Sequence, residues 1–193
     1  ETTAAATEAE TTAAESAAEE SSAEETKAAA DIETVTPGKL TVATSPDFAP
    51  YEFYAIGEDG TPKLAGFDMD LAQYIADYLG LELEVVTVDF DGVISELQTK
   101  SVDLGMAGLS PDEKRMGIMD FSDLYYMGGQ SLVTVKDNAE KYNSFEAINK
   151  PDVSVGAQVG SIQMDLANEN SPEADIVGLP KVTDIISELL TGK

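Results

Sequence analysis

Residues 102–115, which read VDLGMAGLSPDEKR, form the most informative segment of this chain. Its first five residues form a strand-like run, and the small residues that follow let a ligand approach the backbone closely. Ser110, Pro111 and Glu113 then form a capping box, which predicts a short helix capped by Ser110. The N–H groups of that helix start and the planar guanidinium of Arg115 suit a carboxylate, whereas the capping box alone needs no ligand. An anion seat and a plain capped helix are therefore both open at this point.

Strand-like and helix-like segments alternate along the rest of the chain. We expect strands at 40–43, 81–88, 102–106, 130–135, 153–157 and 174–177, and helices at 67–79, 93–97, 161–168 and 182–190. A turn at 58–60 predicts a hairpin. This alternation is typical of an α/β fold with a parallel sheet and right-handed crossovers. In such sheets, ligands bind beyond the carboxyl ends of the strands.

The first 36 residues differ in composition from the rest. Residues 1–36 are almost wholly Ala, Thr, Ser and Glu, and Lys27 is their only base. We interpret them as a disordered acidic tether, because they contain no apolar stripe to bury. The whole chain carries 37 acids against 11 bases, a net charge of −26. Such an excess argues against nucleic acid or an anionic membrane as a partner.

The chain contains neither Cys nor His. This absence excludes thiol nucleophiles, Ser-His-Asp triads and zinc sites built from His or Cys. We expect no metal and no cofactor: the segment 89–92 resembles a calcium loop only superficially and lacks the remaining ligands. No apolar run is long enough to span a bilayer. A long tether before a compact domain suits an exported protein held off a surface, with a cytoplasmic disordered tail as the alternative.

An internal repeat links two distant segments. Residues 94–101 read ISELQTKS and residues 186–193 read ISELLTGK, with five of eight positions identical. Each copy follows a predicted strand and has a helical pattern. The repeat predicts two lobes of similar design, the second of which stops before its next strand. The alternative is chance recurrence of residues that are common in amphipathic helices.

Motifs in a fixed order carry a resemblance to a known family. They are GKLTVAT at 38–44, PYEF at 50–53, GFDMDLA at 66–72, DFDGVI at 89–94, DFS at 120–122 and VGAQVGS at 155–161. With these motifs, residues 38–193 resemble the bacterial extracellular solute-binding proteins of family 3, which are polar amino-acid receptors of ABC importers, and most closely the glutamine-binding type. The resemblance implies a periplasmic-binding-protein-like, two-lobed clamshell of type II. Lobe 1 would cover 37–132, nearly complete, and a truncated lobe 2 would cover 133–193.

The resemblance also implies a ligand site in the first lobe. Phe48 and Phe90 match the aromatic pair that packs on the ligand side chain. Ala107 and Gly108 match the segment whose carbonyl accepts the ligand ammonium, and Ser110 and Arg115 match the residues that hold its carboxylate. A zwitterion that leaves water needs both charges paired, so these roles agree with the chemistry of the side chains.

The second lobe would complete the same site. The resemblance places Gln158 opposite the ligand side chain and adds the N–H groups of Ser161 and Ile162 to the carboxylate. Ser45 stands where the glutamine-binding type has an acid, so the side-chain specificity is expected to differ. The family places an Asp for the ammonium beyond Lys193. We therefore expect this chain to bind weakly or not at all, and residues 136–193 to be marginally stable.

Simpler interpretations remain for the same residues. Phe48 and Phe90 are also suited to an ordinary core, and Arg115 has Asp112 and Asp120 as possible partners. Asp68 favours a helix start rather than a ligand contact.

For function, we expect a monomeric, non-enzymatic extracytoplasmic receptor that delivers a polar amino acid to an ABC permease. It would be held in the bacterial cell envelope by a lipid anchor upstream of Glu1. The alternatives are the ligand-sensing domain of a receptor and, behind it, a dehydratase built on the same fold.

Overall fold

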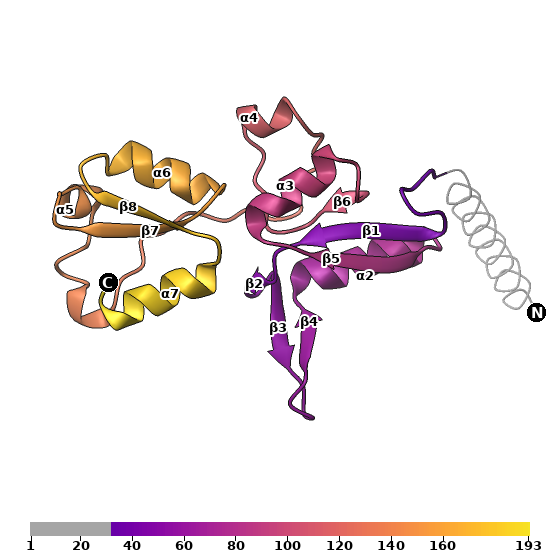
Figure 1. The fold of residues 1–193 in the computed structure, drawn as a ribbon, viewed down its shortest axis with the longest axis horizontal. Coiled ribbons are helices and arrows are strands. Elements are labelled where there is room, and N and C mark those ends of the chain that lie inside the picture. Colours follow the sequence, from indigo (N-terminus) through magenta and orange to yellow (C-terminus); the bar gives the residue numbers. More distant parts are fainter. Residues whose placement is uncertain (1–31) are drawn as a thin grey trace, which may run out of the picture.

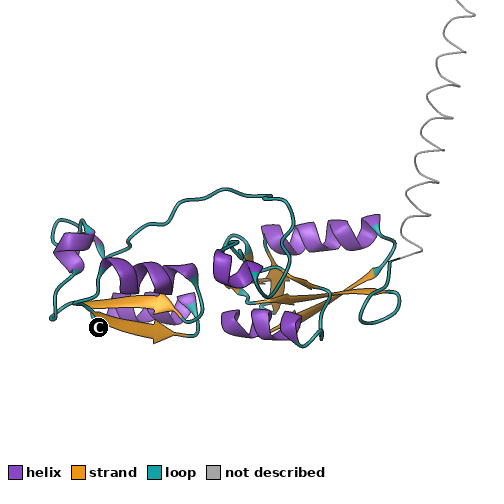
Figure 2. Cartoon of the chain, turned by 90° about the horizontal axis from the view of Figure 1, so that it is seen from above, coloured by secondary structure: helices purple, strands orange, loops and turns teal. Residues whose placement is uncertain are grey.

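A computed structural model describes residues 32–193, which form two lobes (Figure 1). The acidic tether expected at 1–36 lies outside the described residues, apart from its end at 32–36. The lobes are joined by residues 117–135, which contain no helix or strand and arch from one lobe to the other (Figure 2). No helix of the described part combines the length and apolar character needed to cross a membrane.

The first lobe is built on a three-stranded parallel sheet. Strand β1 (Lys39–Thr44) lies between β5 (Glu82–Thr87) and β6 (Leu104–Gly105), and both neighbours run parallel to it. Helices α2 (Phe67–Tyr78) and α3 (Phe90–Gln98) provide the crossovers. The parallel α/β sheet expected from the sequence is therefore confirmed.

Alternate residues of β1 face two separate cores. Leu40 and Val42 pack with Ala72 and Ala76 of α2, whereas Ala43 packs with residues of α3 and with the segment that follows β6. Side chains of a strand point alternately to its two faces, so one short strand organises both layers. The cluster on the α3 side contains Phe90, Val93, Val102 and Ala107.

A small antiparallel sheet projects from the first lobe (Figure 1). It consists of β2 (Asp47–Phe48), β3 (Glu52–Ile56) and β4 (Pro62–Ala65). The predicted hairpin at 58–60 connects β3 to β4, and the Gly57 N–H donates to the carbonyl of Thr61 at 2.9 Å. The short strand β2 follows β1 directly and brings its residues to the boundary between the lobes.

The second lobe has a similar but smaller design. Strands β7 (Ser154–Gln158) and β8 (Asp175–Leu179) are parallel, and α6 (Ile162–Asn170) and α7 (Val182–Thr191) lie on opposite sides of them (Figure 1). Two short elements, a 3₁₀ turn η1 (Lys136–Asn138) and α5 (Phe145–Ile148), precede the sheet. The order strand, helix, strand, helix repeats that of β1, α2, β5 and α3.

The internal repeat is confirmed in atomic detail at the ends of α3 and α7. The hydroxyl of Thr99 donates to the carbonyls three and four residues before it, at 3.2 and 2.9 Å, and that of Thr191 does the same at 3.0 Å each. The residues that follow, Lys100 and Gly192, both have left-handed backbone, with φ of 56° and 81°. The two segments therefore share one helix ending, as well as a sequence.

One predicted strand is absent from the structure. Residues 130–135 form no ladder, and within residues 32–193 no other segment is paired with them. Leu132 and Val133 are exposed. Their β-branched and apolar side chains favour a strand, but a strand forms only where another backbone offers hydrogen bonds.

Candidate ligand-binding site

Residues that follow the parallel strands meet at the boundary between the lobes. Asp47 follows β1 and Asp89 follows β5, while Gly160 and Lys181 follow β7 and β8 of the second lobe. Asp47 contacts Gln158 and Val182, and the amine of Lys181 lies 3.8 Å from a carboxylate oxygen of Asp89. The carboxyl ends of the strands in both sheets therefore border one crevice, as expected for ligand sites in α/β folds.

Arg115 is the centre of one side of this crevice. It is buried, with 6% of its surface exposed, and its Nε lies 3.1 Å from the Asp112 carboxylate. Its two terminal nitrogens donate to the carbonyls of Ser110 at 2.8 Å and of Gly160, in the second lobe, at 2.9 Å. A guanidinium has five N–H donors. Among the described residues, the ion pair and the two hydrogen bonds leave one N–H on each terminal nitrogen without a partner, and such groups can bind a carboxylate.

The predicted capping box at Ser110 is wrong. Helix α4 (Glu113–Met116) begins two residues later and is capped by Asp112, whose Oδ1 accepts the Arg115 N–H at 2.9 Å. A carboxylate accepts at both oxygens, so Asp112 caps the helix and pairs with the Arg115 side chain together. The alternative pairing of Arg115 with Asp112 is therefore confirmed. The Ser110 carbonyl accepts from Arg115, and the role of Ser110 toward a ligand carboxylate stays a prediction.

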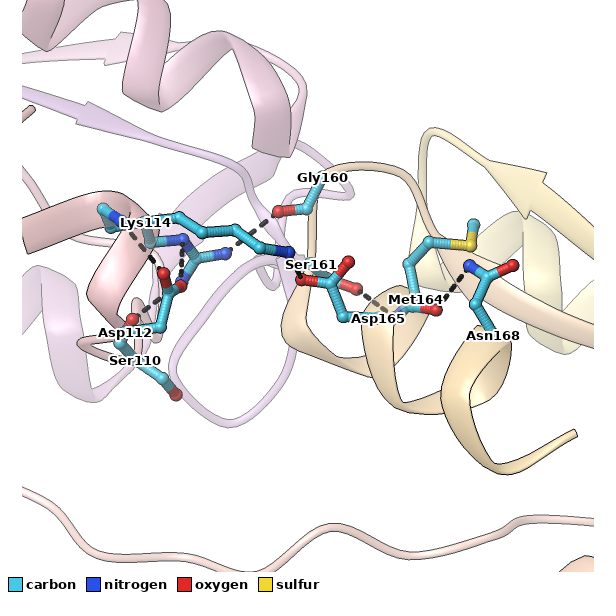
Figure 3. Close-up of polar contacts among 9 residues, drawn as sticks. Ser110, Asp112, Lys114, Gly160, Ser161, Met164, Asp165 and Asn168 are labelled. Atoms are coloured by element: carbon cyan, nitrogen blue, oxygen red, sulfur yellow. Dashed lines mark hydrogen bonds and ion pairs between the residues drawn. The ribbon is translucent and has the colours of Figure 1, made fainter. Parts of the chain in front are cut away.

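The helix start predicted at Ser161 is confirmed. The Ser161 hydroxyl accepts the Met164 N–H at 3.2 Å and donates to the Gln158 carbonyl at 2.7 Å. Ile162 is the first residue of α6. Figure 3 shows this helix start facing Ser110 and Asp112 of the first lobe, with the amine of Lys114 extended to Asp165 at 2.9 Å. Lys114 and Asp165 are mostly exposed, so their ion pair contributes little to the closure.

The two predicted aromatic residues occupy different environments. Phe90 is part of the core cluster beside α3, and the Arg115 guanidinium lies 5.8 Å from its ring centre. Phe48 stacks on Tyr51, with ring centres 5.3 Å apart, and lies against Gly108. A Cβ at Gly108 would be 3.3 Å from the Phe48 ring, and the φ of Gly108 is 56°. Phe90 therefore both packs in the core and lies beside Arg115 at the crevice.

The other predicted residues have structural partners of their own. Ala107 is buried in the core cluster beside α3. The Ser45 hydroxyl donates to Asp47 at 2.9 Å. The Gln158 amide donates to Asp47 at 3.1 Å and to the Pro180 carbonyl at 3.0 Å. Gln158 thus spans the two lobes in this structure, and its role toward a ligand side chain stays a prediction.

A buried acidic pair behind Gly108 was missed by the sequence reasoning. Asp68 begins α2, as expected, but its Oδ2 also accepts the Gly108 N–H at 3.0 Å and its Oδ1 accepts the Tyr125 hydroxyl at 3.0 Å. Glu52 is fully buried, and neither of its carboxylate oxygens has a hydrogen-bond partner among the described residues. Burial, together with the negative charge of Asp68, raises the pKa of Glu52 to about 10. Glu52 is therefore protonated at neutral pH.

A hollow of about 750 Å³ lies beside the residues that follow the carboxyl end of β1. Asp47, Tyr54 and Asp89 line it from the first lobe, and Lys181 and Thr183 line it from the second. Its volume is in the range of small-molecule sites. Arg115 and Gly108 do not line it. Asp47 lines the hollow, and the next residue, Phe48, lies against Gly108.

Comparisons with known proteins agree with this arrangement. A family model described as bacterial extracellular solute-binding proteins, family 3, matches residues 40–187. An arginine-binding extracellular protein of Bacillus subtilis is 35% identical over 153 residues, which are 78% of this chain and 56% of that protein. A cyclohexadienyl dehydratase of Pseudomonas aeruginosa is 30% identical over 156 residues, which are 81% of this chain and 57% of the enzyme.

A solved structure is similar in fold as well as in sequence. The substrate-binding protein of an amino-acid ABC transporter from Streptococcus pneumoniae, bound to L-arginine, has a TM-score of 0.77 and 37% identity. The match covers 80% of this chain and 64% of that protein. The chain thus spans a little over half the length of the curated relatives above. The two-lobed fold with a shorter second lobe, inferred from the sequence, is confirmed.

Proposed function

Because this chain belongs to the bacterial extracellular solute-binding proteins of family 3, we propose that it is the ligand-binding part of a receptor that holds a polar amino acid between its lobes. The receptor delivers that amino acid to the permease of an ABC importer. The observation that carries the proposal is Arg115, a buried guanidinium at the crevice. An ion pair and two hydrogen bonds hold it, and among the described residues one N–H on each terminal nitrogen has no partner.

The chemistry of an amino-acid ligand fits these free groups. Its carboxylate would take both N–H groups of Arg115, because a bidentate pair of this kind is short, directional and strong. The N–H groups at the start of α6 would add donors from the second lobe, where Ser161 caps the helix. The Gly108 carbonyl and the ring of Phe48 would lie along the ligand. The neutral Glu52 behind them adds no second negative charge to the site.

The charge of the hollow favours a basic side chain on the ligand. Asp47 and Asp89 line it together with Lys181, and half of the Asp89 side chain is exposed. The contact of Asp89 with Lys181, at 3.8 Å, is loose enough to be exchanged for a cationic ligand group. Arginine is the ligand in the pneumococcal structure and in the name of the Bacillus relative. The closer likeness to the glutamine-binding type stays a prediction.

The remaining parts of the proposal concern the whole receptor. It would act outside the cytoplasm, as a monomer, held at the cell envelope by a lipid anchor that precedes Glu1. It would pair with the permease subunits of the importer, and membership of a solute-binding family supports this pairing. The receptor would bind its ligand without turnover, because the carboxyl group with the most strongly raised pKa, Glu52, is fully buried and therefore poorly placed as a general acid.

An amide-resolved NMR titration tests the proposal and detects weak binding. Arginine, histidine, glutamine and glutamate are added in turn to the chain of 193 residues. Arginine is expected to shift the Arg115 side-chain Nε–H and the amides of Gly108 and Ser161. Glutamate is expected to give the smallest shifts.

Matched variants show whether those shifts report on the proposed seat. Arg115→Lys keeps the charge and removes the fork, so the shifts should vanish. Lys63→Arg, the reverse exchange on the exposed β4 strand, should bind like the parent. Shifts that persist in Arg115→Lys, or an absence of shifts with all four amino acids, would contradict the proposal.

A further inference from the structure

The two lobes also meet on the side of the crevice away from Arg115. There Asp47, in the short strand β2 of the first lobe, accepts the backbone N–H of Val182 at 2.6 Å and the side-chain amide of Gln158 at 3.1 Å. Val182 and Gln158 both belong to the second lobe. The Ser45 hydroxyl donates to the other oxygen of the same carboxylate at 2.9 Å and so orients it.

The contact with Val182 supplies something that α7 lacks in its own sequence. Val182 is the first residue of this ten-residue helix, and its N-cap residue, Lys181, makes no side-chain capping bond. A lysine has no acceptor and adds positive charge at the positive end of the helix dipole. Helix N-termini are stabilised by an oxygen acceptor, most often from Ser, Thr, Asp or Asn. For α7, the carboxylate of Asp47 in the other lobe takes that position.

Helix α3, the partner of α7 in the internal repeat, begins differently. Its N-cap residue is Asp89, which also makes no side-chain capping bond, and Asp91 lies in its first turn. Helix α7 likewise carries an acid in its first turn, Asp184, but its N-cap residue is Lys181. The acceptor of the Val182 N–H is Asp47, 135 residues earlier in the chain.

We propose that Asp47 is a positioning residue that favours closure of the two lobes by capping α7 across the crevice. The start of α7 is therefore more stable when the lobes are closed than when they are open. When the lobes separate, Val182 and Gln158 lose the same acceptor together. When the lobes close, Asp47 again accepts the Val182 N–H, a cap that Lys181 of the second lobe does not provide. Asp47 would in this way set the fraction of molecules that are closed before a ligand binds.

The consequence for a ligand follows from that fraction. The apparent dissociation constant equals the intrinsic one divided by the population of the binding-competent state. A loss of closure therefore weakens binding by the same factor, in addition to any effect of the Asp47 charge at the hollow. This part rests on the proposed function, whereas the effect on closure is independent of it.

The test measures the distance between the lobes without a ligand. The chain has no Cys, so Lys63→Cys on the β4 strand and Glu169→Cys on α6 introduce two unique sites for a donor and an acceptor dye. In this labelled chain, Asp47→Ala is expected to lower the ratio of closed to open molecules about tenfold, the effect of losing a cap and a charge-assisted bond. Asp59→Asn, which removes one acid at the exposed hairpin, should leave the ratio unchanged.

A second pair of variants separates closure from simple helix stability. Lys181→Ser gives α7 a cap of its own. In the Asp47→Ala background it should restore the hydrogen-exchange protection of the first turn of α7 but leave the lobes open. Alone, it should also shift the lobes toward the open state, because open molecules then no longer lack a cap and the contact of Lys181 with Asp89 is lost. The proposal is overturned if Asp47→Ala leaves the dye distance unchanged, or if Lys181→Ser closes the lobes again.

Adding arginine to these variants separates the closure role of Asp47 from the proposed receptor function. If arginine shifts the Arg115 and Gly108 resonances but Asp47→Ala leaves the lobe ratio unchanged, the receptor function stands and the closure role is wrong. If no amino acid binds and Asp47→Ala still opens the lobes, the closure role stands and the receptor function is wrong. If both hold, the apparent dissociation constant rises about tenfold in Asp47→Ala.

Discussion

The Asp68 carboxylate accepts the backbone N–H of Gly108 at 3.0 Å, although the two residues are 40 positions apart in the chain. The same carboxylate accepts the Tyr125 hydroxyl from the segment that joins the lobes. Asp68 therefore holds the loop of the candidate site and the start of the connection to the second lobe at one point. It is fully buried, so each of these bonds replaces water that the group has lost.

Replacing Asp68 should destabilise the first lobe. Asp68→Ala leaves the Gly108 N–H and the Tyr125 hydroxyl without their acceptor, at an expected cost of about 2–4 kcal/mol in the free energy of unfolding. Asp70→Ala, on the exposed side of the same helix turn, serves as the control and should cost less than about 1 kcal/mol. Urea unfolding of the two variants measures the difference. Equal stabilities would show that the buried carboxylate does not hold the loop.

The buried Glu52 predicts a specific dependence of stability on pH. Its pKa is raised from 4.5 to about 10 in the folded protein, chiefly because it is buried. Between these values the folded state keeps a proton that the unfolded state releases, so the free energy of unfolding falls as pH rises. The slope contributed by one such group is at most about 1.4 kcal/mol for each pH unit.

The variant Glu52→Gln isolates this contribution. It keeps the shape and cannot ionise, so its stability should decline less between pH 6 and pH 9 than that of the parent, by roughly the slope above. Glu58→Gln, in the exposed hairpin turn, should follow the parent. Parallel stability profiles for Glu52→Gln and the parent would mean that Glu52 is not protonated in the folded protein.

Gly160 of the second lobe lies close to Asp91 of the first. Its φ is 77°, and a Cβ built there would lie 3.1 Å from the Cβ of Asp91 on α3. Gly160→Ala should therefore add strain of about 1–2 kcal/mol and move the lobes apart, because both the backbone and the neighbouring helix oppose the methyl group. Small-angle scattering should show a larger radius of gyration. Gly129→Ala, where no atom lies within 4 Å, is the control, and an equal radius for both variants would contradict the account.

The repeated helix ending predicts opposite effects of two substitutions. Lys100 and Gly192 both have left-handed backbone, which costs a residue with a side chain about 1 kcal/mol more than glycine. Lys100→Gly should therefore stabilise the chain by up to about 1 kcal/mol, and Gly192→Ala should destabilise it by a similar amount. Chemical denaturation measures both, and changes of the same sign would be inconsistent with a shared helix ending.

Most of the secondary structure was predictable because its signals are local. The apolar spacing of α2 and the β-branched runs of β1 and β5 identify these elements without knowledge of their neighbours. The segment 130–135 has the same kind of signal. A strand also needs a neighbouring strand to pair with, and the residues of the segment itself do not show whether one is present. The cap of α4 was misassigned for a related reason: Ser110 and Asp112 both suit a cap, and only the fold decides between them.

The sequence predicted which residues lie at the candidate site better than it predicted their hydrogen-bond partners. Arg115, Phe90 and Ser161 do lie at the crevice, because each follows the end of a parallel strand. Asp68 and Asp47 were not recognised as organising groups, since their partners lie 40 and 135 positions away. The signal available at Asp68 was a good first-turn residue, which is correct but incomplete. Burial of a carboxylate depends on what folds over it, and no local pattern reports that.

An amino acid bound between the lobes should have its carboxylate on Arg115. A crystal structure of the chain grown with L-arginine would show this. We expect the α-carboxylate on the terminal nitrogens of Arg115, close to the first turn of α6, with the ligand beside Phe48 and Gly108. Arginine bound away from Arg115, or an Arg115 that keeps only its ion pair and two hydrogen bonds beside an empty crevice, would show that Arg115 does not hold the ligand.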